Sequence, residues 1–490
     1  MGSRRGISRK IPSASVGMTR IFLGKFSIRV APAPIGARPN GLMRKSALLV
    51  VGSFAVLSLG AIATACGSSS RDNHFDDPDG AVSIDGGLGG NNNLGETAPP
   101  CTGLECKQVA CSGGKTTTLK GTVFSPAKSN PDPIYNAILY VPNGALEPFA
   151  EGVSCEKCGT ITSGSPLVTA LSEADGTFTI ENVPAGDDIP LVIQVGRWRR
   201  EITIPKVEAC KDNDLDADLT RLPRNQQEGD IPLMAIVTSS YDATECLMHK
   251  IGIDDSEFTP GSGNGRIHIY QGGGGQLTGA TPGTSLWGNP QALARYDVVA
   301  FPCSSQPTDA PGRQNVVDYA NAGGRVFITD LSQDIIKSGP APWPTTAVWT
   351  PTGSPPNPGL IDTTFPKGEA LAEWLQVTGA TTTKGQLPLT GTFGRLSDVV
   401  APSQRWVYGT NNVQTYSFNT PVGEDEANQC GRVIYSSFHV TQTAGSGQIP
   451  ASCGTGNTLS PQERALEFMI FDLAACIIKD GEKPIPPPVK

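Results

Sequence analysis

The segment from Tyr296 to Asp330, YDVVAFPCSSQPTDAPGRQNVVDYANAGGRVFITD, constrains the fold more than any other part of the 490-residue chain. It begins with a short apolar run, Val298 to Phe301, which is rich in β-branched residues and too short for a helix. A helical segment then stops at Gly323 and Gly324, and Arg325 to Thr329 forms a second apolar run. Strand, helix and strand in so few residues indicate a right-handed crossover in a parallel sheet.

Residues 230 to 480 predict an α/β domain around this crossover. Pro232 to Thr238 is a continuous apolar run, as expected of a strand buried on both faces. Further strands are expected at Arg266 to Tyr270 and at Gly431 to His439.

The closing helix of this domain has the clearest signals in the chain. Ser460 suits the N-cap, Pro461 the first helical position, and Glu463 completes a capping box. An apolar face extends from Ala465 to Ile477, so the helix should pack on the sheet and end near Ile478.

Residues 117 to 222 predict an all-β sandwich, because short apolar runs recur at regular spacing between turn signals. The expected strands are Leu119 to Phe124, Ala137 to Val141, Thr177 to Ile180, Leu191 to Val195 and Glu201 to Ile204. The only basic aromatic cluster, Arg197 to Arg200, predicts a solvated hairpin tip or, alternatively, a surface on which a sugar stacks.

Two sequence patterns resemble known families. The runs LKGTVFSP and ADGTFTIENVPAGDDIPLVIQ are similar to the carboxypeptidase-regulatory or CNA-B type of β-sandwich, which is a spacer or adhesive module. YDVVAFP, VVDYANAGGRVFITD and the late GRVIYSSFHV resemble the class I glutamine-amidotransferase-like fold, nearest its ThuA-like branch. Together they imply a multidomain chain, an all-β sandwich plus an α/β flavodoxin-like parallel sheet flanked by helices.

The catalytic pattern of the amidotransferase-like family is missing from this chain. The family's nucleophile lies in a Gly-x-Cys-x-Gly elbow, whereas Cys303 is flanked by Pro302 and Ser304 and has no glycine to permit such a strained turn. His439 is followed two residues later by Thr441 and not by an acid. We therefore expect a binding or structural module with neither metal nor cofactor. The alternative is an envelope hydrolase for a carbohydrate or peptide, with Cys303 as nucleophile, His439 as base and Asp330 as orienting acid.

Ligands of open parallel sheets bind beyond the carboxyl ends of the strands. Besides the three residues of the alternative enzyme, five residues follow strands and are candidates for lining such a crevice. They are Ser239, Ser240, Tyr241, Ser304 and Ser305.

The N-terminus predicts export and a lipid anchor. MRKSALLVVGSFAVLSLGAIATAC, residues 43 to 66, has a basic start, an apolar core and small residues before a cysteine, and it resembles a bacterial lipoprotein signal with Cys66 as the lipidated residue. An ordinary secreted protein is the alternative. In the lipoprotein interpretation, residues 1 to 65 are an extension plus signal with the true start at Met43, and residues 66 to 116 are a disordered tether. Residues 481 to 490 are expected to form a Pro-rich tail.

The predicted export also bears on the expected partners and on the chemistry of the cysteines. Beyond residue 65 the chain has 28 basic and 46 acidic residues, which disfavours nucleic acid and leaves the membrane, a carbohydrate or an envelope protein. Outside the cytoplasm disulfides persist. We expect Cys155–Cys158 as a loop bridge, and Cys430–Cys476 and Cys246–Cys303 because each pair should lie at one edge of the sheet.

Overall fold

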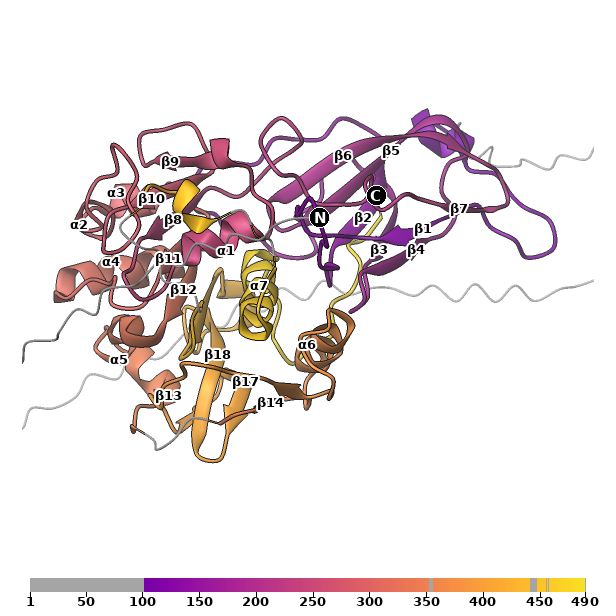
Figure 1. The fold of residues 1–490 in the computed structure, drawn as a ribbon. Coiled ribbons are helices and arrows are strands. Elements are labelled where there is room, and N and C mark those ends of the chain that lie inside the picture. The colour runs from indigo at the N-terminus through magenta and orange to yellow at the C-terminus, as the bar shows by residue number, and fades with distance from the viewer. Residues whose placement is uncertain (1–100, 352–355, 441–446, 455, 457, 490) are drawn as a thin grey trace, which may run out of the picture. The chain divides into compact units, whose positions relative to one another are not determined.

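The computed structural model describes residues 101–351, 356–440, 447–454, 456 and 458–489, all within one compact unit that spans Leu94–Lys490 (Figure 1). The expected signal, Cys66 and the tether up to residue 100 lie outside the described residues. In the part of the chain that is described, no helix is both long enough and apolar enough to cross a membrane.

The β part, residues 117–222, contains two small sheets. One has the strand order β4-β1-β7 and the other β3-β2-β5-β6. Their bounds are β1 Thr118–Thr122, β2 Ile138–Pro142, β3 Pro166–Leu171, β4 Thr177–Ile180, β5 Gly186–Val195, β6 Trp198–Val207 and β7 Asp212–Asp214. β3 and β7 were not expected; β7 lies in an acidic run, where Lys120 Nζ of β1 pairs with Asp212 Oδ2 at 2.6 Å.

The α/β part, residues 230–480, is built on a ten-stranded mixed sheet with the order β15-β14-β17-β18-β19-β12-β11-β8-β10-β9. In the part of this order that runs from β19 to β9, each strand is parallel to the next one. In chain order, β10, β8, β11, β12 and β19 stand as 2-1-3-4-5. These parallel strands are β8 Met234–Val237, β9 Phe258–Pro260, β10 Ile267–Tyr270, β11 Val298–Phe301, β12 Arg325–Thr329 and β19 Gly431–Ser436.

The expectation of a purely parallel sheet is corrected by four antiparallel strands at one side. They are β14 Gly359–Ile361, β15 Gln386–Leu387, β17 Gln404–Gly409 and β18 Asn412–Thr420, and a separate pair is formed by β13 Ala347–Val348 and β16 Asp398–Val399. β18, NVQTYSFNT, is buried along its whole length. Its mixture of polar and apolar residues shows no alternation, which is why the pattern did not predict it.

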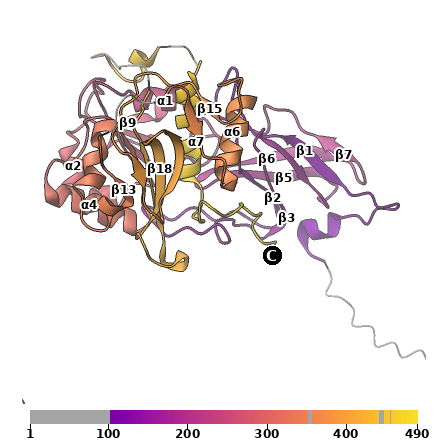
Figure 2. The ribbon, with the colours of Figure 1, turned by 90° about the horizontal axis from the view of Figure 1, so that it is seen from below.

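Helices cover both faces of the sheet. Alternate residues of a strand point to opposite faces of the sheet. In β8, Met234 and Ile236 belong to the core with α1, α6 and α7, whereas Ala235 and Val237 belong to the core with α2 to α5. The helices are α1 Thr244–Lys250, α2 Thr284–Trp287, α3 Pro290–Leu293, α4 Ala310–Asn321, α5 Asp334–Lys337, α6 Pro366–Val377 and α7 Pro461–Ala474 (Figures 1 and 2). Single 3-10 turns are η1 Gly103–Lys107, η2 Asp255–Glu257, η3 Asp330–Gln333, η4 Trp343–Thr346, η5 Glu426–Asn428 and η6 Ala451–Cys453.

The capping box that begins α7 is confirmed: the Ser460 side chain accepts from the Glu463 amide, and the Glu463 side chain accepts from the Ser460 amide. The expected end near Ile478 is wrong, because α7 ends at Ala474. The chain turns extended there, and the Ile477 amide bonds to the carbonyl of Glu156 in the β part.

The two parts share one apolar core. A single cluster contains side chains from both small sheets together with α1, α6, α7 and one face of the ten-stranded sheet. The turn between β5 and β6 enters this contact: Gly196 has φ +56°, and a Cβ there would lie 1.7 Å from the carbonyl oxygen of Ala474. Trp198 is fully buried and meets Phe471 of α7 edge-on, with ring centroids 5.7 Å apart. The expectation of a solvated hairpin tip is therefore wrong.

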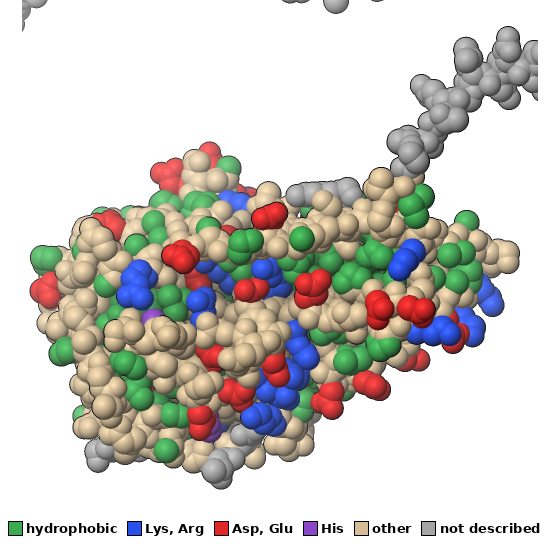
Figure 3. Space-filling model, turned by 90° about the horizontal axis from the view of Figure 1, so that it is seen from above, with side chains coloured by type: hydrophobic (Ala, Val, Ile, Leu, Met, Phe, Trp, Pro, Cys, Tyr) green, Lys and Arg blue, Asp and Glu red, His purple; other side chains and the backbone are tan. Residues whose placement is uncertain are grey.

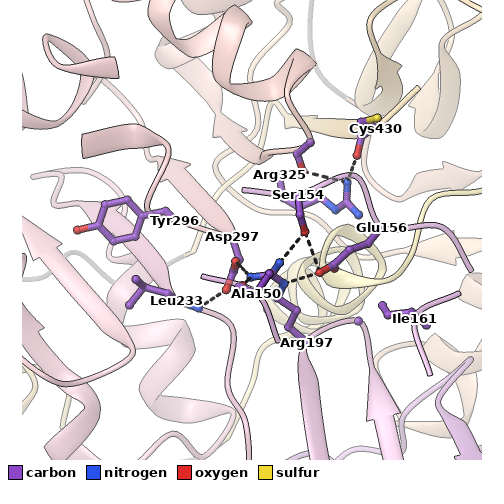
Figure 4. Close-up of polar contacts among 12 residues, drawn as sticks. Ala150, Ser154, Glu156, Ile161, Arg197, Leu233, Tyr296, Asp297, Arg325 and Cys430 are labelled. Atoms are coloured by element: carbon purple, nitrogen blue, oxygen red, sulfur yellow. Dashed lines mark hydrogen bonds and ion pairs between the residues drawn. The ribbon is translucent and has the colours of Figure 1, made fainter. Parts of the chain in front are cut away.

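Arg197 is the polar centre of the contact (Figure 4). Its guanidinium binds Asp297 Oδ1 at 2.5 Å and Glu156 Oε1 at 2.6 Å, and it also donates to the Ser154 hydroxyl. Asp297, which directly precedes β11, accepts the Leu233 amide as well. A buried arginine with two carboxylates joins residues from the β part to the start of a parallel strand.

Disulfides fasten the same contact. Cys155 bonds to Cys430 before β19, and Cys158 bonds to Cys476 after α7. The expected bridges Cys155–Cys158 and Cys430–Cys476 are therefore wrong in pairing. Cys430 and Cys476 do come to one edge of the sheet, but the loop with the two earlier cysteines lies between them and takes both.

The remaining cysteines also differ from expectation. Cys246 of α1 bonds to Cys453, not to Cys303, and Cys303 is free and buried. Near the described N-terminus, the pairs Cys101–Cys106 and Cys111–Cys210 are formed. Five disulfides are consistent with an extracytoplasmic, oxidising compartment.

Candidate functional site

Three neighbouring parallel strands deliver the three residues of the candidate site. β11 is followed by Cys303, β12 by Asp330 and β19 by His439, and β12 pairs with both of the other strands. Because parallel strands end at the same edge of a sheet, residues that are distant in the chain meet there. One ligand atom from each residue lies within 4.8 Å of the other two.

Cys303 and Asp330 form the buried floor of the site. Each is 2% exposed, and the Cys303 thiol donates to Asp330 Oδ2 at 3.3 Å. Burial raises the pKa of the Cys303 thiol to about 11, and the adjacent carboxylate acts in the same direction. The thiol is therefore protonated at neutral pH and lacks the activation that a nucleophilic cysteine requires.

Asp330 is bound from its other side by an arginine. Arg395 Nε donates to Asp330 Oδ1 at 2.6 Å, so the two carboxylate oxygens have different partners. The carbonyl of Asp330 accepts from the Tyr435 hydroxyl at 3.1 Å. The arginine thus orients the carboxylate toward the thiol, and the tyrosine holds the backbone of Asp330.

His439 forms the partly exposed side of the site. Its Nδ1 lies 2.9 Å from the carbonyl oxygen of Val440, and Phe393 lies against the ring with centroids 6.2 Å apart. With the proton on Nδ1, that nitrogen donates to the carbonyl, and Nε2 keeps a free lone pair.

Asp242, which the sequence analysis missed, joins the ends of all three strands. It is fully buried, and its carboxylate accepts from the amide of Val440 at 3.2 Å and from the hydroxyl of Thr329. The backbone of Cys303 also donates to it. Burial raises its pKa. Its place shortly after β8 was the available signal, since an acid at a strand end is costly unless it has partners.

Glu245, on the first turn of α1, was missed as well. It is fully buried, and neither carboxylate oxygen has a hydrogen-bond partner among the described residues. Burial raises its pKa to about 8. The group is therefore held protonated at neutral pH.

The five crevice candidates divide into two groups. Ser239 and Ser305 are buried and donate to backbone carbonyls, Ser239 to that of Cys303 at 2.5 Å and Ser305 to that of Thr238 at 2.7 Å. Ser240, Tyr241 and Ser304 are exposed, Tyr241 by 59%. The first pair supports the strand ends, and only the second group faces solvent.

A separate groove of about 770 Å³ lies at the opposite, disulfide-bonded contact. Its lining includes Ile138 and Leu171 of the β part, Cys476, and the tail residues Pro484 and Ile485. The tail is anchored where the Thr169 hydroxyl donates to the carbonyl of Pro487 at 2.8 Å. On the face drawn in Figure 3, acidic and basic side chains are interspersed and apolar ones lie between them.

No family model matches the chain, and no curated protein matches it. Among solved structures, it is similar over a limited region to two type II Cohesin-X-Dockerin complexes from Acetivibrio cellulolyticus. For a C-terminal interface mutant the identity is 19%, the coverage 26% of this chain and 78% of that chain, and the TM-score 0.16. For an N-terminal interface mutant the values are 18%, 28%, 85% and 0.15.

Proposed function

We propose that the protein is an extracytoplasmic, lipid-anchored binding or structural module without thiol-hydrolase activity. The observation on which this rests is the cysteine pattern. All described cysteines except Cys303 are bridged, and two bridges fasten the β part to the α/β part. Such pairing favours an oxidising compartment and yields a stiff unit suited to display beyond a membrane.

The domain types belong to this proposal. We assign the β part to a sandwich of the carboxypeptidase-regulatory or CNA-B type and the α/β part to a flavodoxin-like sheet with amidotransferase-like ancestry. The 2-1-3-4-5 order of the parallel strands supports the second assignment. The apolar groove beside the tail supports a binding role, and a peptide or carbohydrate of the envelope is the partner class that it suits.

Lipidation at Cys66 is the test of the anchor. In cells fed a radiolabelled fatty acid, the whole protein should carry label and sediment with membranes. Cys66→Ala should lose the label and appear in the soluble extracytoplasmic fraction. Serine replacement of Cys101, a bridged cysteine outside the signal, is the control and should keep the label. A Cys66→Ala protein that remains labelled and membrane-bound would show that the assignment is wrong.

The hydrolase is kept as a second candidate because the structure brings Cys303, Asp330 and His439 together. It requires a thiolate at neutral pH, whereas burial raises the pKa of this thiol to about 11. Iodoacetamide added to the folded protein at pH 7 therefore distinguishes the two candidates. We expect no modification of Cys303 until denaturant is added, and rapid modification of the native protein would favour the hydrolase.

A further inference from the structure

We propose that Cys303, Asp330 and His439 form a binding site for one zinc ion, with the thiolate, a carboxylate oxygen and the imidazole as its protein ligands. The inference goes beyond the binding module proposed above and does not depend on the lipid anchor. No metal was expected from the sequence, in which these three residues stood only as the catalytic group of the alternative hydrolase.

The spacing of the ligand atoms suits a tetrahedral ion. A thiolate at about 2.3 Å and a carboxylate oxygen at about 2.0 Å from zinc are roughly 3.5 Å apart at the tetrahedral angle. Cys303 Sγ and Asp330 Oδ2 are 3.3 Å apart, and all three donor atoms lie within 4.8 Å of one another. The three donor atoms are therefore close enough together to share one ion.

The donor types select the metal. A thiolate and an imidazole bind zinc well, whereas magnesium and calcium prefer sites made only of oxygen ligands. The thiolate and the carboxylate together carry the two negative charges that balance a divalent ion. When the ion binds, it replaces the thiol proton that now lies between sulfur and Asp330, and this proton leaves to solvent.

The ligand side chains are oriented by hydrogen bonds from neighbouring groups, as ligands in metal sites commonly are. Asp330 is held through its second oxygen by Arg395, and His439 is held through Nδ1 by the Val440 carbonyl, which leaves Nε2 for the metal. Asp242 anchors the backbone of Cys303 and the residues next to the other two ligands, through the hydroxyl of Thr329 and the amide of Val440. We read Asp242 as a positioning residue of the site.

Access is from one side. Cys303 and Asp330 are buried, whereas His439 is partly exposed and adjoins Phe393, which is 39% exposed. An ion therefore enters past the imidazole. Three protein ligands leave a fourth position for water or a ligand, as in zinc sites that bind substrates.

Cobalt is the most direct probe, because a Co²⁺–thiolate bond gives a charge-transfer absorption that oxygen and nitrogen ligands do not. The whole mature protein, with disulfides intact, is dialysed against a chelator and titrated with Co²⁺. We expect the thiolate band to saturate at one equivalent and to disappear when Zn²⁺ is added. Cys303→Ser should abolish the band, and Asp330→Asn and His439→Gln should each weaken binding at least tenfold.

His249→Gln is the matched control, because partly buried His249 contacts the exposed carboxylate of Asp255 at 2.9 Å and is no proposed ligand. This variant should bind one equivalent as the native protein does. A second measurement does not depend on the folding of variants. Zn²⁺ should raise the melting temperature of the native protein, and Mg²⁺ and Ca²⁺ should not. A native protein without a thiolate band, or equal cobalt affinity in all four variants, would overturn the proposal.

Discussion

The disulfide between Cys158 and Cys476 offers the sharpest test of how the two parts are joined. We expect the double variant Cys158→Ser/Cys476→Ser to fold, because the Cys155–Cys430 bridge still fastens the same loop. It should nevertheless unfold at lower denaturant. The loss arises mainly in the unfolded chain, which gains freedom when a cross-link is removed.

The size of the loss follows from the loop that the second bridge closes. Taken alone, Cys158–Cys476 spans 318 residues, for which loop-closure entropy predicts between 5 and 6 kcal/mol, roughly, at 25 °C. With Cys155–Cys430 intact, the loop contains only the 3 residues from Cys155 to Cys158 and the 46 from Cys430 to Cys476. A loop of roughly 50 residues corresponds to about 4 kcal/mol.

Urea unfolding followed by circular dichroism, without reductant, measures this difference in the free energy of unfolding. The matched control is Cys101→Ser/Cys106→Ser, which opens a bridge that spans only 5 residues at the exposed η1 and should cost about 2 kcal/mol or less. If the first variant loses no more than the control, the bridge does not constrain the chain as the structure implies. Non-reducing peptide mapping of both proteins verifies the pairing.

Two further predictions concern a buried acid and the boundary between the parts. The pKa of Glu245 is about 8 in the native state against 4.5 as its ordinary value, so the free energy of unfolding should fall as pH rises from about 4.5 to 8. Glu245→Gln should remove that fall: it should be as stable as the native protein near pH 4.5 and more stable at pH 9 by about 3 to 5 kcal/mol. Denaturant titrations at several pH values measure this difference. The control is Glu181→Gln at an exposed position, which should follow the native protein. A chain of residues 228–490 should show no cooperative melt by circular dichroism. It lacks the β part of the shared core, and it lacks Cys155 and Cys158, which bond to Cys430 and Cys476. A cooperative melt would contradict that reasoning.

Sequence patterns predicted the centre of the α/β part well. The strands Val298 to Phe301 and Arg325 to Thr329 are present with the expected bounds, and the capping box at Ser460 is formed. These elements are specified locally, by apolar runs and by capping chemistry within a few residues. Two ends were misjudged: α7 stops at Ala474, before the Ile477 amide contacts the distant Glu156, and the strand expected to reach His439 stops at Ser436.

Features that depend on contacts between the parts were not predictable in the same way. Arg197 and Trp198 read locally as an exposed basic aromatic turn, and only the arrival of α7 and the carboxylate of Asp297 makes that turn a buried contact. Disulfide pairing failed for the same reason. Strand and helix lengths placed Cys430 and Cys476 at one edge correctly, but no local signal showed that a loop of the β part reaches the space between them.

The candidate site was predictable as a place, since the parallel-strand rule brought Cys303, Asp330 and His439 to one edge. The chemistry of these three side chains also bears on what the site binds. In an oxidising compartment a free thiol is protected by burial, and an apolar pocket achieves that at the lowest free energy. Here the thiol instead contacts a buried carboxylate, which needs Arg395 to compensate it, and an imidazole lies within reach. Packing alone does not account for three such polar groups held together at a free-energy cost, whereas a shared cation accounts for all of them.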